Sequence, residues 1–172
     1  MGIDEDNKEY DFEATLVFIV EGRRVLLALK KLKIGKGRFN GYGGAIELTD
    51  NSIEAAAARE FFQECGCRIK EDRLRKVAEA YFTNVKSDGG LFVCKVHVFL
   101  LKRRHCKGTP VASGEMGKPQ WFKKKMLPEN MMVADRYWIP EIFKRKKLIV
   151  KATMQKSQSE LLDLEIAEVK SF

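Results

Sequence analysis

The sequence lacks the signals that direct a chain into or across a membrane. Its first dozen residues are acidic and polar, so they do not have the charged-then-apolar layout of a secretory signal. No apolar run approaches the roughly 20 residues that span a bilayer. Internal repeats, low-complexity tracts and linkers are also missing. A chain of 172 residues with 45% hydrophobic content therefore predicts one soluble, intracellular domain over residues 1–172, of which residues 1–12 are expected to be disordered or loosely attached.

Cysteine and histidine are scarce, with four of the former and two of the latter. Without a secretory signal, the cysteines are expected to be reduced thiols rather than a disulfide framework. Cys65 and Cys67 do not have the spacing of a zinc knuckle, and His97 and His105 complete no recognisable ligand set. The sequence therefore argues against a structural zinc site.

Acidic residues are outnumbered, 24 against 32 lysines and arginines, which gives a net charge of +8. The positive charge gathers at residues 30–38, 102–104, 123–125 and 144–147. Such clusters suit a polyanionic ligand, and solvated turns and strand ends explain the last three equally well. The first cluster differs, because it runs directly into a glycine-rich segment.

Runs rich in β-branched and aromatic residues predict strands, and helical periodicity with capping residues predicts helices. The predicted strands are residues 14–20, 24–30, 75–85, 91–102, 120–123, 148–154 and 161–169. The predicted helices are residues 52–65 and 134–146, and Pro140 limits the second to a first-turn start or imposes a kink. This order predicts an α+β domain with a mixed β-sheet sandwiched between α-helices.

Residues 35–44 contain five glycines, a density that implies positive φ angles or close approach of the backbone to a ligand. The first helix follows this segment. Asn51 is its expected N-cap, with Glu54 three residues on in the manner of a capping box, and Gly66 supplies the stop.

Glu60, Gln63 and Glu64 fall on one face of that helix. Residues i and i+4 lie about 5–6 Å apart at Cβ, so Glu60 and Glu64 can reach one hard cation. Magnesium is normally bound by one or two carboxylates together with phosphate oxygens and water. A solvated surface helix would carry the same acidic stripe. The adjoining glycine-rich turn and basic stretch favour a metal site, because they attract phosphate.

Residues 43–47 (GGAIE) and 59–67 (REFFQECGC) together resemble the Nudix box. That pattern has a glycine, a glutamate and then Arg-Glu-U-x-Glu-Glu-x-Gly-U, where U is aliphatic. The spacing from Gly44 to Arg59 is one residue longer than the pattern, which places the early glutamate of the box at Asn51 or Asp50. Gln63 stands where the first of the paired glutamates is usual.

Further matches extend in order from about Thr15 to Val169 and resemble the eukaryotic MutT homologues, which are oxidised-purine nucleoside triphosphatases. The matching segments are residues 25–31, 37–44, 96–99, 108–111, 115–116, 121–122 and 137–138. The resemblance implies the Nudix fold. It also implies cleavage of substrates such as 8-oxo-dGTP to the monophosphate and pyrophosphate, which sanitises the nucleotide pool.

The same resemblance implies the site residues. Metal ions, Mg²⁺ or alternatively Mn²⁺, would be held at Gly44, Glu60, Gln63, Glu64 and Glu115, and an activated water would attack a phosphate. Arg59 would brace the helix by pairing with a carboxylate, and it joins Glu60, Glu64 and Glu115 in the expected catalytic set. The purine pocket would be formed by Thr15, Lys30, Asn40, Phe82, Cys94, Met132, Asp135 and Trp138.

Several positions depart from the family pattern. Met132 stands where the family has a base-stacking tryptophan, Ala134 replaces the first of two adjacent aspartates, and Cys94 replaces a methionine. These changes predict a looser base preference, because polar contacts to a base edge reject wrong bases better than shape does. Gln63 predicts an altered metal demand or lowered turnover, because an amide oxygen supplies no negative charge.

Two alternative functions stay open. A Nudix relative acting on diphosphoinositol polyphosphates or capped RNA would suit the basic surface. A catalytically silent nucleotide- or RNA-binding module would explain the missing carboxylates at Gln63 and Asn51. The expected partner is a small-molecule nucleotide, with nucleic acid as a less favoured ligand, no membrane and a monomeric state. The expected location is the cytoplasm, with nuclear or mitochondrial nucleotide pools as alternatives.

Overall fold

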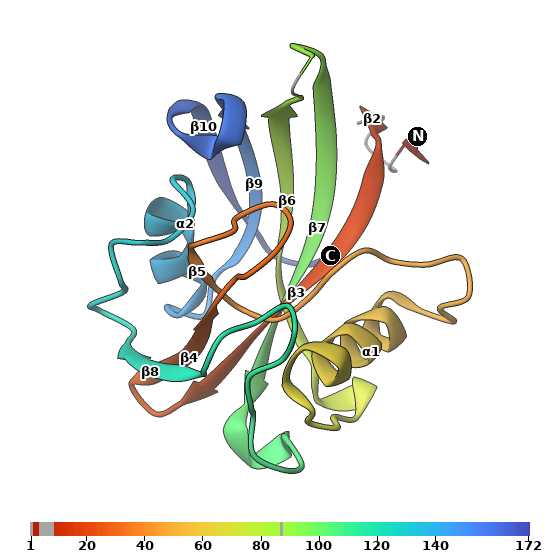
Figure 1. The fold of residues 1–172 in the computed structure, drawn as a ribbon, viewed down its shortest axis with the longest axis vertical. Helices are drawn as coiled ribbons and strands as arrows, with labels where there is room; N and C mark the ends of the chain where they lie inside the picture. The colour runs from red at the N-terminus through yellow and green to blue at the C-terminus, as the bar shows by residue number, and fades with distance from the viewer. Residues whose placement is uncertain (1, 4–8, 87) are drawn as a thin grey trace.

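A mixed β-sheet forms the centre of the molecule. The computed structural model describes residues 2–3, 9–86 and 88–172. Within these residues, eight strands form one sheet in the order β10-β9-β6-β7-β3-β4-β5, with β8 paired to β4 (Figure 1). The strands are β3 (Phe12–Glu21), β4 (Arg24–Leu29), β5 (Phe39–Asn40), β6 (Arg75–Val85), β7 (Leu91–Lys102), β8 (Gln120–Lys123), β9 (Lys147–Met154) and β10 (Leu161–Val169).

Antiparallel and parallel pairs alternate in this sheet from β10 to β4, and β4 is antiparallel to all of its partners. β3 runs parallel to β7, and β6 runs parallel to β9, whereas β6 and β7 are antiparallel neighbours. The predicted bounds of β6, β7, β8 and β10 are confirmed, and those of β3, β4 and β9 are correct to within two residues. Alternating side chains and clear turn residues explain this accuracy, since both signals are local.

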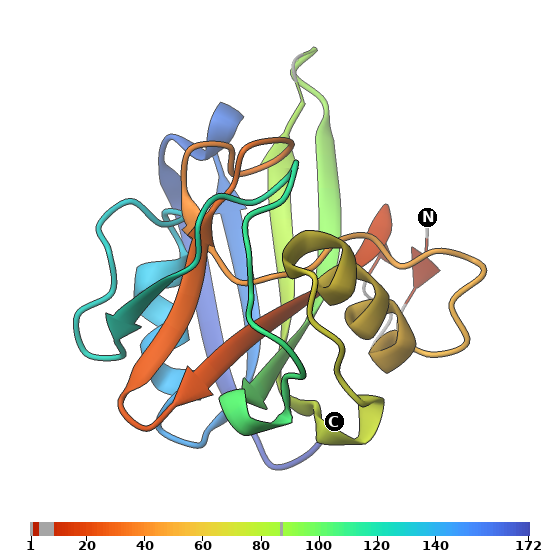
Figure 2. The ribbon, with the colours of Figure 1, turned by 60° about the horizontal axis from the view of Figure 1, so that its bottom comes forward.

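A helix covers each face of the sheet, as the sequence predicts. α1 (Ile53–Cys65) lies over one face and α2 (Asp135–Ile142) over the other (Figures 1 and 2). Successive side chains of a strand point to opposite faces. Phe18 on β3 therefore packs in the layer of α2, where its ring meets Trp138 at 6.4 Å, and Ile19 packs in the layer of α1.

The start of α1 differs from the prediction. Ser52, not Asn51, is the N-cap, with extended backbone angles and an Oγ that accepts a hydrogen bond from the Ala55 N–H at 2.9 Å. Both residue types cap helices well, and the backbone geometry decides between them. Glu54 therefore does not occupy the third helical position that a capping box requires. The helix ends where expected, at Gly66, with φ of 73°.

The second helix is shorter than predicted. It begins at Asp135 and ends at Ile142, with Pro140 inside it rather than in its first turn. Proline removes one backbone donor and hinders the preceding turn, so the helix stops two residues later. Arg145 then adopts a left-handed φ of 67° and turns the chain into β9.

The remaining elements are short. The N-terminal segment 1–12, expected to be loosely attached, lies outside the described residues at 1 and 4–8. Of its other residues, β1 (Gly2–Ile3) pairs with β2 (Glu9–Tyr10). Turns of 3₁₀ helix occupy Glu71–Arg73, Arg103–His105 and Lys156–Gln158. No helix within the described residues combines the length and apolar character needed to cross a membrane.

Replacement of Gly66 tests the end of α1. We expect Gly66→Ala to lower the free energy of unfolding by about 1 kcal/mol, because alanine is strained at positive φ. Space is not the obstacle, since an added Cβ would meet only Val111 at 3.5 Å. Urea unfolding measures the change. Gly114→Ala is the control, because Gly114 has open space and no left-handed φ. Equal stability of the two variants would contradict the prediction.

Candidate active site

The glycine-rich segment, residues 35–44, is joined to β3 by backbone hydrogen bonds. The Thr15 N–H donates to the Gly44 carbonyl at 2.8 Å, and Val17 and Tyr42 exchange two backbone hydrogen bonds at 2.7 and 2.9 Å. A Cβ at Gly43 would collide with the backbone of Thr15, and one at Gly44 would collide with the carboxylate of Glu60. Glycine is therefore required at position 43, where the backbone of β3 leaves no space for a Cβ, whereas a side chain at position 44 would displace the carboxylate of Glu60.

Glu64 is buried between the helix and this segment. Its side chain accepts a hydrogen bond from the Gly43 N–H at 2.7 Å, and the residue is only 2% exposed. Burial raises the pKa of Glu64 to about 7, whereas the charge of Lys30 and the Gly43 N–H act in the opposite direction. Part of the predicted acidic stripe is thus inside the protein, while Phe62 on the same helix is 42% exposed.

Arg59 ties the start of the helix to the preceding loop. Its guanidinium binds both carboxylate oxygens of Asp50, at 2.9 and 2.8 Å, and donates to the Ala45 carbonyl at 2.9 Å. It also contacts Glu60 at 2.6 Å. The hydrogen bonds from Arg59 lower the pKa of Asp50 and those to Asp50 raise the pKa of Arg59. A two-point pair of this kind fixes orientation as well as charge.

Glu115 approaches from a separate loop. Residues 110–117 rise beside residues 30–38 (Figure 2), and the Lys31 N–H donates to the Glu115 carbonyl at 2.8 Å. The Glu115 carboxylate pairs with the Lys33 ammonium at 3.1 Å. This hydrogen bond raises the pKa of Lys33, and the charges of Glu60 and Glu64 act in the same direction. Three carboxylates therefore stabilise the charged form of the Lys33 side chain.

Glu60, Glu64 and Glu115 carry the type of donor that a hard divalent cation prefers. Within the described part of the chain, no three aspartate, glutamate, histidine or cysteine side chains are grouped so that they could hold a metal ion together. Glu60 and Glu64 nevertheless lie one helical turn apart, and the charges of Glu60 and Glu115 both act on Glu64. Carboxylate oxygens beside a side-chain-free Gly44 match the ligands that magnesium prefers. Gln63 is exposed and contacts Arg59 at 3.5 Å.

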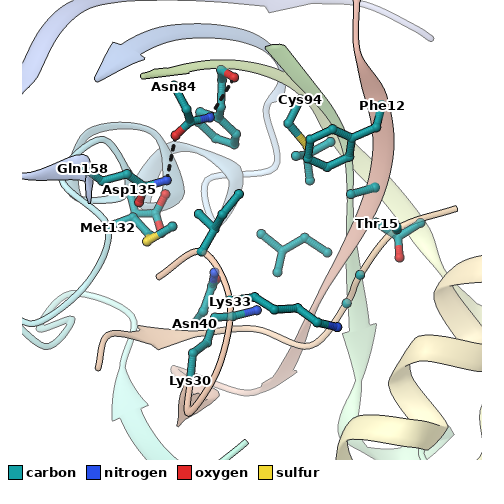
Figure 3. Close-up of a pocket in the computed structure, with 18 of the residues that line it drawn as sticks. Phe12, Thr15, Lys30, Lys33, Asn40, Asn84, Cys94, Met132, Asp135 and Gln158 are labelled. Atoms are coloured by element: carbon teal, nitrogen blue, oxygen red, sulfur yellow. Dashed lines mark hydrogen bonds between the residues drawn. The ribbon is translucent and has the colours of Figure 1, made fainter. Parts of the chain in front are cut away.

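A cavity of about 460 Å³ opens beside these groups (Figure 3). Seven of the eight residues predicted for the purine pocket line it: Thr15, Lys30, Asn40, Phe82, Cys94, Met132 and Asp135. Gly44 and Glu115 from the predicted metal site line the same cavity. The predicted purine pocket and part of the predicted metal site thus border one continuous space, whereas Glu60, Gln63 and Glu64 are not among the residues that line it.

Trp138 does not line the cavity. It is fully buried behind the wall, where its ring lies 6.4 Å from that of Phe82 and its Nε1–H donates to Asp135 Oδ1 at 3.1 Å. Asp135 Oδ2 and Thr15 Oγ1 have no hydrogen-bond partner within the described residues. Buried polar atoms are normally paired, so these two are available to a ligand.

Comparison with known proteins identifies the family. The model of the NUDIX domain matches residues 12–142. This range includes α1 and the glycine-rich segment, which carry the Nudix box motif. The chain belongs to the Nudix family.

Relatives and solved structures agree with this membership. The chain is 36% identical over 159 residues to a Mus musculus protein named oxidized purine nucleoside triphosphate hydrolase, covering 92% of this chain and 96% of the relative. A Danio rerio protein of the same name is 36% identical over 136 residues, covering 78% and 81%. The crystal structure of a MutT protein from Bacillus halodurans has the same fold, with a TM-score of 0.74 at 21% identity, covering 90% of this chain and 97% of that one.

The geometry decides one point that the Nudix box spacing left open. Asp50, rather than Asn51, carries the carboxylate that pairs with Arg59. The extra residue before the helix therefore leaves a carboxylate in contact with this arginine, and an aspartate supplies it.

Several residues that line the cavity of about 460 Å³ were not predicted. Phe12, Lys33, Asn84 and Gln158 also line it. Asn84 follows Phe82 by two residues on β6, so strand alternation could have identified it. Gln158 lies in the turn between β9 and β10, where no local pattern indicates which side chains reach the cavity.

The pH dependence of stability tests the environment of Asp135. Burial raises its pKa to about 7 from the usual 3.8, although the Trp138 N–H and the charge of Arg38 oppose this. Between about pH 4 and 7 the folded chain retains a proton that the unfolded chain has lost, so this residue makes stability fall as pH rises. We expect the stability of Asp135→Asn relative to wild type to increase over that range and then level off, as measured by urea unfolding.

Asp163→Asn serves as the control, because Asp163 is exposed on β10. Its stability should follow the wild-type pH curve throughout. Parallel curves for Asp135→Asn and wild type would contradict the proposed burial effect.

Proposed function

We propose that this Nudix chain hydrolyses oxidised purine nucleoside triphosphates, such as 8-oxo-dGTP, to the monophosphate and pyrophosphate. The observation that carries the proposal is the single cavity, which has Asn40, Phe82 and Asp135 among its lining residues together with Gly44 and Glu115. A nucleoside and its phosphates therefore have adjoining places in one space. The names of the mouse and zebrafish relatives support the same substrate class.

The phosphates would lie beside α1, which carries Glu60 and Glu64. Glu60, Glu64 and Glu115 would hold Mg²⁺, or alternatively Mn²⁺, with Gly44 and Gln63 at its border. The bound cation would supply charge neutralisation on the phosphates and orient the attacking water. Lys30 lines the cavity, and its positive charge lowers the pKa of Glu64. A lysine between the carboxylates and the phosphates would attract both groups.

Glu64 would hold the cation as an ionised carboxylate. Burial raises the pKa of Glu64 to about 7 without a cation, and the positive charge of a cation would favour the ionised form at neutral pH. The Gly43 N–H fixes one of its oxygens, and Arg59 would position the helix through Asp50. Arg59 is thus a positioning residue in this scheme.

The purine would occupy the end of the cavity that Asn40 and Phe82 line. Phe82 offers a ring face, and Asn40 has an Oδ1 that already accepts the Gly41 N–H at 2.8 Å, which leaves its Nδ2 group as the donor for a ligand. Met132 and Cys94 give a flexible, polarisable wall in place of a rigid aromatic one. A looser base preference follows from that composition.

Glu64→Gln tests the catalytic role. We expect kcat for pyrophosphate release to fall at least about a hundredfold, because the amide supplies no negative charge to balance that of the cation. Malachite-green detection with added pyrophosphatase measures the rate. Glu54→Gln is the matched control in the first turn of the same helix and should retain wild-type activity. An active Glu64→Gln variant would remove Glu64 from this role.

A substrate panel tests the substrate class. Oxidised purine triphosphates should be hydrolysed with higher kcat/KM than pyrimidine triphosphates, and EDTA should abolish release until Mg²⁺ or Mn²⁺ is restored. The panel should include capped RNA and a diphosphoinositol polyphosphate. Faster hydrolysis of dCTP or of any non-nucleotide diphosphate would overturn the proposal. Thermal stabilisation by nucleotides without phosphate release would identify a silent binding module instead.

A further inference from the structure

Gln158 is a buried polar residue held in an unfavourable backbone conformation at the cavity wall. It is 6% exposed, lines the cavity and has a φ of 54°. A left-handed φ is unfavourable for a non-glycine residue, because the Cβ crowds the backbone. Two backbone contacts hold it there: its N–H donates to the Gln155 carbonyl at 2.8 Å, and its carbonyl accepts from Arg38 Nη2 at 3.3 Å.

A chain of hydrogen bonds fixes which way the Gln158 amide points. It begins at the Phe82 carbonyl, which can only accept, so Asn84 must turn its Nδ2 toward it, at 3.0 Å. Asn84 Oδ1 then faces Gln158 and accepts from its Nε2 at 3.0 Å. The remaining atom, Gln158 Oε1, is an acceptor with no partner within the described residues.

This acceptor belongs to the nucleoside end of the cavity. Figure 3 shows Gln158 beside Asp135 and Met132, across the cavity from Thr15 and Phe12, with the two hydrogen bonds of Asn84 drawn as dashed lines. Asp135 Oδ2 in the same corner is also unpartnered among the described residues. Two unsatisfied polar atoms at one wall indicate a ligand edge that carries hydrogen-bonding groups.

We propose that Gln158 Oε1 accepts a hydrogen bond from an N–H group on the edge of the purine, with Asn84 as the residue that positions it. This inference rests on the proposed function and deepens it, because it names the substrate class as purines that present an N–H donor. It also provides a second polar contact beside Asp135, where Ala134 supplies none.

Pairs of purines in which one member carries an additional N–H donor test the inference. Suitable pairs are guanine and hypoxanthine, which differ by the 2-amino group; adenine and unsubstituted purine, which differ by the 6-amino group; and 8-oxoguanine and guanine, which differ by N7–H together with the C8 oxygen. Each is used as the deoxynucleoside monophosphate for binding by calorimetry and as the triphosphate for kcat/KM. Wild type should favour the N–H-bearing member of at least one pair about tenfold, since a buried acceptor left unpaired costs that much.

Gln158→Met keeps the length of the side chain and removes the acceptor. The preference should fall to near unity in this variant. Gln155→Met is the matched control, because Gln155 is an exposed glutamine of the same connection and does not line the nucleoside cavity. Asn84→Leu is the second variant. It frees the Gln158 amide to rotate and should also reduce the preference.

The ratio within a pair separates recognition from structural damage. A variant that is merely destabilised lowers binding of both members equally, and that result in both Gln158→Met and Asn84→Leu would overturn the inference. So would an unchanged ratio in Gln158→Met, or a wild type that discriminates no pair. If the wild type releases no pyrophosphate, the proposed function fails, but the monophosphate binding ratios still decide the role of Gln158. A wild type that binds none of the monophosphates overturns both.

Discussion

The close approach of the glycine segment to β3 positions everything else in the site. Thr15 bonds to Gly44 through the backbone, and the neighbouring Gly43 N–H binds the buried carboxylate of Glu64. A side chain at Gly43 would push the segment away from the backbone of Thr15, and one at Gly44 would displace the carboxylate of Glu60. The glycine backbone thus contacts both β3 and the Glu64 carboxylate of α1. It therefore holds this carboxylate in a fixed position relative to the cavity that Thr15 lines.

Electrostatic balance is the second requirement of this arrangement. Glu60, Glu64 and Glu115 influence one another, and like charges brought together destabilise the fold unless cations offset them. Arg59 balances Asp50 and Glu60 on the loop side, and Lys33 balances Glu115 on the other. The helix therefore keeps its carboxylates aligned, and in the proposed mechanism an incoming cation would compete with Lys33 for Glu115.

The sequence predicted the parts of the molecule that local patterns specify. Alternation located β6 and β7 to the residue, and the resemblance placed Asn40 and Asp135 at one cavity. The N-cap was misplaced, because Asn51 and Ser52 are equally good caps and only the fold distinguishes them. Gln158 was missed for a different reason. Its place at the cavity depends on a turn between β9 and β10 and on a hydrogen bond to Asn84, 74 residues away. The wall position of Trp138 likewise reflects packing on Phe18, which no periodicity reveals.

The parallel pairing of β3 with β7 has a consequence for how this molecule acquires its site. Residues 12–20 pair with residues 94–102, so the central contact of the sheet closes a loop of about 80 residues before it returns any stability. Folding with such distant contacts is slow compared with helical bundles. Thr15, Phe82, Glu115 and Gln158 come from segments spread over nearly the whole chain. A nucleotide that contacted all of them would bind only the completely folded chain, so it would stabilise the native state by RT ln(1 + c/Kd), where c is the free nucleotide concentration, with no offsetting affinity for the unfolded chain.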